Sequence, residues 1–184
     1  MEFNQSVSNP MLVGAIELLK EENTPAHQNM FAAELAKASF LSPALIEPEP
    51  KEGEDGKLAV APGSKVQFPM VSSPDGQKFF MAFTDMSEYE KWQEKNKKLP
   101  YFALKIEDYA AMVLRRDAKG NLCPALGIII NPMGGSIVVP REMLAGMMSA
   151  KIAHAKQMAA RGQGTQQPGQ PTVSINSQGR PELS

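Results

Sequence analysis

The sequence predicts one α+β domain with a mostly antiparallel sheet of about five or six strands, an N-terminal helix pair and a long C-terminal helix. Three observations predict this class. Two helix-start signals follow each other closely near the N-terminus, short alternating segments joined by turn residues fill the middle, and a long apolar stripe at helical spacing follows Pro140. A chain of 184 residues has room for one such domain and a tail.

Each helix-start signal near the N-terminus is an N-cap residue followed by proline. Asn9 precedes Pro10, and Thr24 precedes Pro25. Apolar residues then recur at helical spacing, which predicts two short helices in an αα-hairpin. The apolar residues are Leu12, Ile16 and Leu19 in the first helix and Phe31, Leu35 and Ala38 in the second.

The middle of the chain predicts short strands. Residues 42–47, with Pro43 at the start and Pro48 just beyond the end, are the first candidate. A hairpin is expected over residues 65–83, because two alternating segments flank the turn sequence Pro74-Asp75-Gly76. The alternating apolar residues are Val66, Phe68 and Met70 before the turn and Phe79, Met81 and Phe83 after it.

Two more short helices are expected. Thr84 and Asp85 are candidate caps for a helix that carries Tyr89 and Trp92. The acidic pair Glu107-Asp108 begins the second helix, where the helix dipole favours negative charge, and Arg115-Arg116 ends it, where the dipole favours positive charge.

Three further strands are predicted. Residues 101–105 form one of them. The uninterrupted apolar run 125–130 predicts a central strand covered on both faces, and a turn containing Asn131 and Gly134-Gly135 leads to a strand at 137–139. We expect this last pair to share a sheet with the 65–83 hairpin, and the helices to pack mainly on one face.

The longest predicted helix begins after Pro140 and ends near Ala160. The predicted domain therefore covers residues 1–161. Residues 162–184 are rich in glutamine, proline and glycine and have few apolar side chains to bury, so we expect a disordered tail. The acidic segment 47–63 is expected to be a solvated loop.

Composition limits the class of partner. The formal net charge is −1, from 19 basic and 20 acidic residues, so the chain-wide basic field typical of nucleic-acid binding is absent. The single cysteine suits a reducing compartment. The N-terminus does not resemble a secretory signal, and the longest apolar run is too short to span a bilayer. We expect a cytoplasmic protein that binds neither nucleic acid nor membrane.

The residues that carry enzyme chemistry do not form a recognisable set. His27 and His154 have no second ligand at zinc spacing, and Cys123 has no nearby base that the sequence identifies. The best carboxylate candidates for acid–base chemistry, in Thr84-Asp85 and Glu107-Asp108, stand at helix starts, where capping and the helix dipole account for them. The sequence therefore predicts no enzyme, no cofactor and no metal site.

Methionine is unusually frequent, with twelve in the chain. Met143 and Met147 lie beside the stripe that Leu144, Met148 and Ile152 form on the last predicted helix, and they widen it. Such a stripe is typical of core packing, but flexible methionine side chains also suit a partner-binding face. We treat Met143, Leu144, Met147 and Met148 as the candidate partner surface.

The ordered motifs resemble the SseB N-terminal domain family of bacterial proteins over roughly residues 9–150. The motifs that carry the resemblance are Asn9 with its helix, Phe31 and Leu35, the Pro43–Pro48 strand, Asp75-Gly76, Phe83-Thr84-Asp85, Tyr89 and Trp92, Glu107-Asp108-Tyr109, and Ile130-Asn131-Pro132. The resemblance implies an α+β fold, a bacterial cytoplasmic protein and a link to secretion systems.

We therefore expect a non-enzymatic protein-interaction module, an adaptor or regulator that binds a protein partner or a second copy of itself. Three alternatives stay open. One is a regulatory domain that binds a small ligand between sheet and helices, and another is a secretion-associated accessory protein. The third is an enzyme of unrecognised type, in which Asp85, Glu107, Asp108 and His27 would meet in one cleft.

Overall fold

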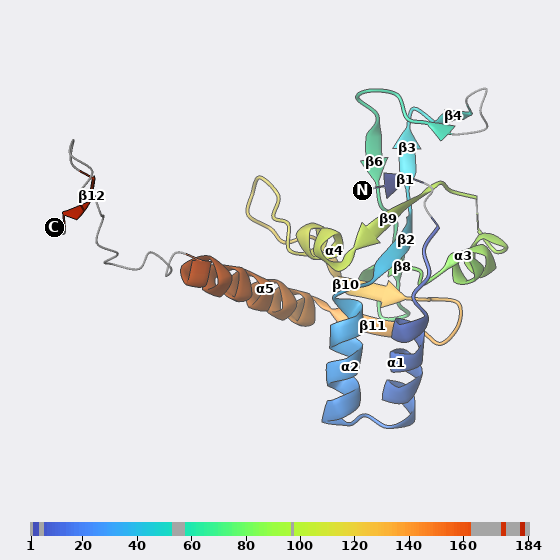
Figure 1. Cartoon of the computed structure of the whole chain (residues 1–184). Coiled ribbons are helices and arrows are strands. Elements are labelled where there is room, and N and C mark those ends of the chain that lie inside the picture. The colour runs from blue at the N-terminus through green and yellow to red at the C-terminus, as the bar shows by residue number, and fades with distance from the viewer. Residues whose placement is uncertain are drawn as a thin grey trace. The chain divides into compact units, whose positions relative to one another are not determined.

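The computed structural model describes residues 2–3, 6–52, 58–96, 98–162, 174–175 and 181–182 (Figure 1). The chain divides into two compact units, Met1–Met148 and Ser149–Ser184. The α+β class is confirmed, with a long C-terminal helix. The two grooves described below, and the hydrogen-bonded polar residues at the ends of the parallel strands, belong to the first unit.

A four-stranded sheet forms the centre of the first unit. Its strands are β7 (Met70–Ser72), β8 (Lys78–Ala82), β10 (Ala125–Ile130) and β11 (Ile137–Pro140), in the order β11-β10-β8-β7. The pairs β7–β8 and β10–β11 are antiparallel, whereas β8 and β10 are parallel. The prediction that the hairpin and the 125–139 pair share one sheet is confirmed.

The other strands divide among smaller sheets, which differs from the single sheet expected. One sheet has the order β1-β9-β2, and two pairs are β3–β6 and β4–β5. A bridge between Leu41 and Phe83 joins the three-stranded sheet to the end of β8. The bounds are β1 (Glu2–Phe3), β2 (Ser39–Pro43), β3 (Leu45–Glu47), β4 (Lys51–Glu52), β5 (Leu58–Ala59), β6 (Lys65–Gln67) and β9 (Tyr101–Lys105).

Two predicted strands are interrupted in the structure. Residues 42–47 belong to β2 and β3, which separate at Ala44, and the backbone N–H of Ala44 donates to the carbonyl oxygen of Pro100. The first arm of the predicted hairpin divides into β6 and β7 on either side of Phe68-Pro69. Proline has no N–H to donate to a sheet ladder, so a strand does not continue through it at an interior position.

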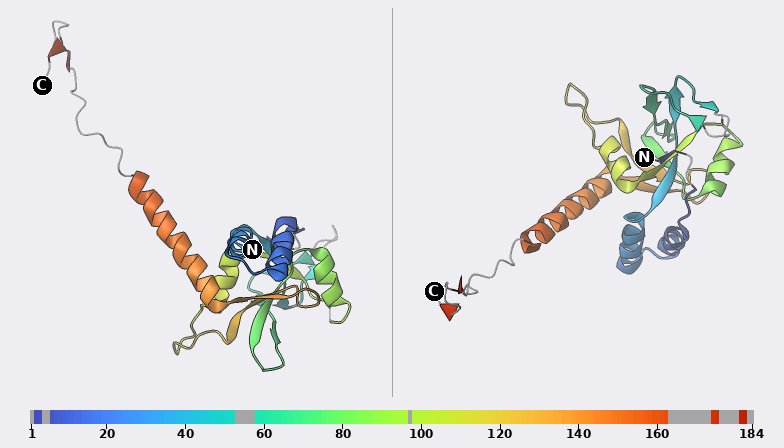
Figure 2. Two further views of the ribbon diagram at one scale, coloured as in Figure 1. Left: turned by 90° about the horizontal axis from the view of Figure 1, so that it is seen from below. Right: turned by 45° about the horizontal axis from the view of Figure 1, so that its top comes forward.

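The helices are α1 (Pro10–Glu21), α2 (Pro25–Leu35), α3 (Met86–Gln93), α4 (Ile106–Val113) and α5 (Arg141–Gly162). The predicted N-terminal pair is confirmed, and α1 and α2 lie side by side in every ribbon view (Figure 2). Thr24 caps α2 as expected, because its side chain accepts a hydrogen bond from the backbone N–H of His27 at 3.2 Å.

Strand β8 is buried on both faces, whereas the alternation had predicted one buried face. Phe80 and Ala82 belong to the larger core cluster, which includes residues of α1, α2 and α4. Met81 and Phe83 belong to a second cluster with Tyr89 and Trp92. Helix α3 therefore covers the opposite face from α1, α2, α4 and the first turn of α5, which contributes Leu144 to the larger cluster. The sequence missed this because alternation shows period but not what covers each face.

The second unit contains most of α5 together with β12 (Ser174–Ile175) and β13 (Pro181–Glu182), which pair antiparallel. Apart from Gly162 and these four residues, the predicted disordered tail lies outside the described residues. Within the described ranges, no helix is long and apolar enough to cross a membrane.

Candidate functional site

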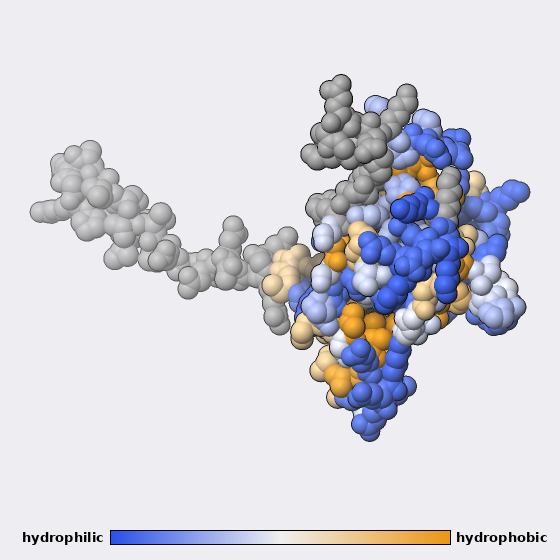
Figure 3. Space-filling view, turned by 90° about the vertical axis from the view of Figure 1, so that its right-hand side faces the viewer, coloured by the Kyte–Doolittle hydropathy of each residue, from blue (hydrophilic) through white to orange (hydrophobic). Residues whose placement is uncertain are grey.

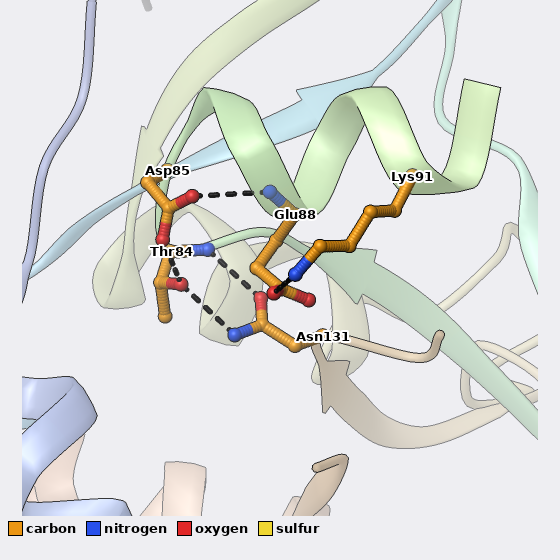
Figure 4. Close-up of polar contacts among 5 residues, drawn as sticks. All are labelled: Thr84, Asp85, Glu88, Lys91 and Asn131. Carbon is orange, nitrogen blue, oxygen red and sulfur yellow. Dashed lines mark hydrogen bonds and ion pairs between the residues drawn. The ribbon is translucent and has the colours of Figure 1, made fainter. Parts of the chain in front are cut away.

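A set of polar side chains joins the ends of the two parallel strands. Thr84 follows β8 and Asn131 follows β10, and parallel strands end at the same edge of a sheet. The side-chain oxygen of Asn131 accepts from the backbone N–H of Thr84 at 3.0 Å, and its amide nitrogen donates to Thr84 Oγ1 at 2.9 Å (Figure 4). Asn131 adopts φ of 51°, in the left-handed region.

Asn9 completes this arrangement. Its side-chain nitrogen donates to the carbonyl oxygens of Ser39 at 2.6 Å and Thr84 at 2.7 Å. Asn9 stands at the N-cap of α1, as predicted, but its side chain makes no capping hydrogen bond there. It instead ties α1 to β2 and to the end of β8. We call Asn9, Thr84, Asp85 and Asn131 the polar junction.

Asp85 has the capping role that the sequence predicted. One carboxylate oxygen accepts from the backbone N–H of Glu88 at 3.0 Å, and the other accepts from the hydroxyl of Thr84 at 2.8 Å. Glu88 pairs with Lys91 through one oxygen and thereby raises the pKa of Lys91, while its other oxygen is buried without a described hydrogen-bond partner. The hydrogen bonds of the polar junction hold chain segments together, which is a structural role.

The other candidates for enzyme chemistry are held separately. Asp108 accepts from the backbone N–H of Lys105 at 2.9 Å, which caps α4. A ring nitrogen of His27 contacts the carbonyl oxygen of Glu22 at 2.7 Å at the start of α2. His154 is exposed on α5, and Cys123 is a half-buried free thiol. The described residues contain no group of three or more His, Cys, Asp or Glu arranged to hold a metal ion.

The four residues of the candidate partner surface are placed unequally. Leu144 is completely buried in the larger core cluster, so it is not available to a partner. Met143, Met147 and Met148 are half-buried and pack against the same cluster. The sequence missed this distinction because helical periodicity places a residue on a stripe without showing how deeply that stripe is covered.

Met143 also lines a groove, which we call the β11 groove. The cavity volume is about 450 Å³. Its apolar lining comes from α1, α2, β11 and the first turn of α5, and consists of Leu19, Phe31, Ile137, Val138 and Met143. Val138 is 45% exposed, one of the larger values for an apolar residue in this unit.

Strand β11 offers an open edge beside this groove. Within the described part of the chain, β11 pairs only with β10. Asn131 donates its backbone N–H to Ala82 on the β8 side, so by alternation Ile129 also directs its backbone groups towards β8. Val138 lies opposite Ile129 and therefore directs its own N–H and C=O away from β10. Pro140 at the end of β11 is the sequence signal that could have identified this edge strand.

Exposed apolar residues also lie elsewhere on the surface. The face drawn in Figure 3 is largely hydrophilic, with small apolar patches between polar residues. Single exposed apolar residues are normal on a soluble domain and need no functional explanation. A groove that combines several of them with an open strand edge is a stronger candidate for binding.

Comparisons with known proteins identify the family. The model of the SseB protein N-terminal domain matches residues 12–146, and these include the polar junction except Asn9, as well as β11. Comparisons with curated proteins and with solved structures gave no significant match. The matched segment covers well over half of the chain, and its motifs occupy the strand ends and helix starts described above. The chain therefore belongs to the SseB family.

Proposed function

We propose that this protein is a non-enzymatic interaction module that binds an extended segment of a protein partner along β11. The observation that carries the proposal is the open edge at Val138, directly beside an apolar groove. An extended segment can add to such an edge as a further strand. Main-chain hydrogen bonds supply affinity, and side-chain pockets supply specificity.

The lining of the β11 groove indicates the chemistry of the partner. Its polar residues include the uncharged side chains of Asn23, Gln28 and Ser136. The one charged residue in the lining, Lys20, donates a hydrogen bond to the carbonyl oxygen of Gly135. We therefore infer that the partner inserts apolar side chains and contributes little charge at this site.

Met143 gives the groove an adaptable wall. A methionine side chain is unbranched and polarizable, so it can repack against inserted groups of different shape. This suits an adaptor or regulator in the cytoplasm that recognises a partner sequence. The hydrogen bonds that occupy Asp85, Asp108 and His27 support a binding role for the module without catalysis.

The proposal is tested by capturing partners with the full chain and with edge variants under identical conditions. Val138→Pro removes the outward N–H, whereas Val138→Thr keeps both the N–H and the branched shape. Met143→Glu places a charge in the groove. A partner bound through β11 should be retained by Val138→Thr and reduced at least about tenfold by Val138→Pro and by Met143→Glu.

Circular dichroism and thermal unfolding check that each variant is folded. A partner retained equally by all three variants would show that binding does not use β11. Loss of self-association in the same variants, measured by sedimentation equilibrium, would identify the partner as a second copy. A small molecule bound by the purified chain and lost in Met143→Glu alone would favour the ligand-binding alternative instead.

A further inference from the structure

A second groove lies at the other end of the central sheet, and we call it the arginine groove. Its cavity volume is about 490 Å³, within the range of about 300–1,000 Å³ typical of ligand sites. The residues that define it are Phe68, Met70, Phe80, Met112, Arg115 and Leu122. They come from β7, β8, α4, and the segments 68–69 and 114–124, so the groove is separate from the β11 groove.

The floor and rim of the arginine groove differ in exposure. Phe80 is buried in the larger core cluster, and Phe68 and Met112 pack against that cluster from partly buried positions. Met70 and Leu122, by contrast, are each 37% exposed on the rim. The groove therefore presents accessible apolar surface on a supported floor, which favours binding an apolar side chain.

A tight turn holds two arginines beside this apolar surface. The backbone N–H of Cys123 donates to the carbonyl oxygen of Arg115 at 2.9 Å, and the backbones of Arg116 and Leu122 form an antiparallel β-bridge. A guanidinium nitrogen of Arg116 donates to the carbonyl oxygen of Gly120 at 2.7 Å. Among the described residues, neither arginine forms an ion pair with a carboxylate, and both are exposed.

The carboxylate in the groove lining is engaged by its own turn. Asp117 accepts hydrogen bonds from the side chain of Asn121 at 3.0 Å and from the backbone N–H groups of Asn121 and Lys119 at 2.8 Å each. These bonds, led by that of the Asn121 side chain, lower the pKa of Asp117. Asp117 therefore stays charged, and its carboxylate is engaged by hydrogen bonds within its own turn. Arg115, Arg116 and Lys119 add positive charge beside the groove.

We infer that the arginine groove binds a segment of a partner protein in which acidic residues flank an apolar side chain. The apolar side chain would occupy the floor at Phe68 and Met112, and the carboxylates would pair with Arg115 and Arg116. Guanidinium groups bind carboxylates through charge-assisted, often bidentate hydrogen bonds, so positive charge selects an acidic segment. This site does not depend on the proposed role of β11.

Fluorescence anisotropy of the full chain with labelled nine-residue peptides tests the inference. In the first peptide aspartate and glutamate alternate with leucine and phenylalanine, in the second lysine replaces the acidic residues, and in the third serine replaces the apolar residues. The first should bind at least about tenfold more tightly than either other peptide, since both charge and apolar burial contribute. Its affinity should fall as ionic strength rises.

Variants distinguish the contribution of the groove to peptide affinity from the contribution of the protein's net charge. Arg115→Glu with Arg116→Glu should weaken the first peptide about tenfold or more, and Arg115→Glu alone should weaken it in the same direction if the double variant fails to fold. Met70→Gln with Leu122→Gln should weaken it less. Lys95→Glu with Lys156→Glu makes the same change in net charge outside the groove, and should change affinity less than about twofold.

Three results would overturn the inference. One is equal weakening by the Lys95 and Lys156 control. Another is evidence of a general anion surface, given either by tight binding of the serine peptide or by equal competition from single-stranded oligothymidylate. The third is an unchanged affinity in both arginine variants. Val138→Pro should leave this peptide binding intact, so failure at the arginine groove and failure at β11 are distinguishable.

Discussion

The polar junction and the two grooves differ in whether their hydrogen-bonding groups already have partners within the fold. At the junction, Asn131 and Thr84 are buried and satisfy each other through two hydrogen bonds. At the grooves, Val138 is exposed and directs its backbone N–H and C=O away from β10, and Arg115 is exposed without an ion pair to a carboxylate among the described residues. Satisfied groups stabilise the fold, whereas exposed and unsatisfied groups are available to bind. The motif that joins the ends of β8 and β10 therefore has a structural role, and we propose that binding occurs at the grooves instead.

The largest expected effect is a loss of stability when the polar junction is broken by Asn131→Ala. The substitution leaves the buried N–H of Thr84 without its acceptor and places alanine at a positive φ. We expect the free energy of unfolding to fall by about 2–4 kcal/mol. Asn131→Gly permits the same φ and should recover roughly 1 kcal/mol of that loss.

Chemical denaturation measures the free energy of unfolding of both Asn131 variants, and the acidic nine-residue peptide serves as the binding probe. Where the protein is still folded, peptide affinity should equal that of the unchanged chain. Loss of peptide binding in a fully folded variant would mean that the arginine groove depends on the polar junction.

A smaller effect is expected from Gly127→Ala, which distinguishes the two grooves from each other. An added Cβ would lie 2.2 Å from the carbonyl oxygen of Val139 and 3.0 Å from the Cα of Pro140, so β10 and β11 must move apart. Overpacking of this kind typically costs about 1–3 kcal/mol. Partner capture through β11 should decrease, while peptide binding at the arginine groove should persist. Equal loss at both sites would contradict this separation.

The smallest expected effect is a pH dependence of the unfolding free energy, which Tyr109 in the larger core cluster carries. Tyr109 is buried and donates its hydroxyl to the carbonyl oxygen of Met81 at 2.8 Å, and burial raises its pKa above the ordinary value of 10.0. The unfolded chain therefore loses this proton first as the pH rises. The contribution is present below pH 10 and is lost above it, by up to about 1.4 kcal/mol for each pH unit.

Comparison with Tyr109→Phe isolates this contribution, because other tyrosines and lysines also titrate in the same range. The unfolding free energy of the unchanged chain should fall more steeply above pH 10 than that of the variant. Parallel pH profiles would show that Tyr109 does not carry the effect.

Much of the fold follows from local signals. Proline after Asn9 and after Thr24 marks the starts of α1 and α2, and Asp85 caps α3 as its position predicted. The turn at 74–76 and the apolar run 125–130 placed β8 and β10 correctly. These features depend on the residues themselves and on neighbours within a few positions, so they are readable in a single sequence.

The candidate sites were less accessible to sequence reasoning. The apolar stripe of α5 identified Met143, but only packing against the larger core shows that Leu144 is buried and that Met143 lines a groove. Arg115 and Arg116 were predicted only as the end of a helix. The structure places them beside Phe68 and Met70, which are more than 40 residues away in the sequence.

The sequence by itself determined the helix starts, the turns, the apolar periods and the family of the chain. Only the tertiary structure decided that β8 is covered on both faces, that β11 has an open edge, and that Asn9 bonds to Thr84 instead of capping α1. The physical reason is that capping, turn formation and periodicity act between near neighbours. Burial, edge position and groove lining depend on contacts between segments that are distant in the chain.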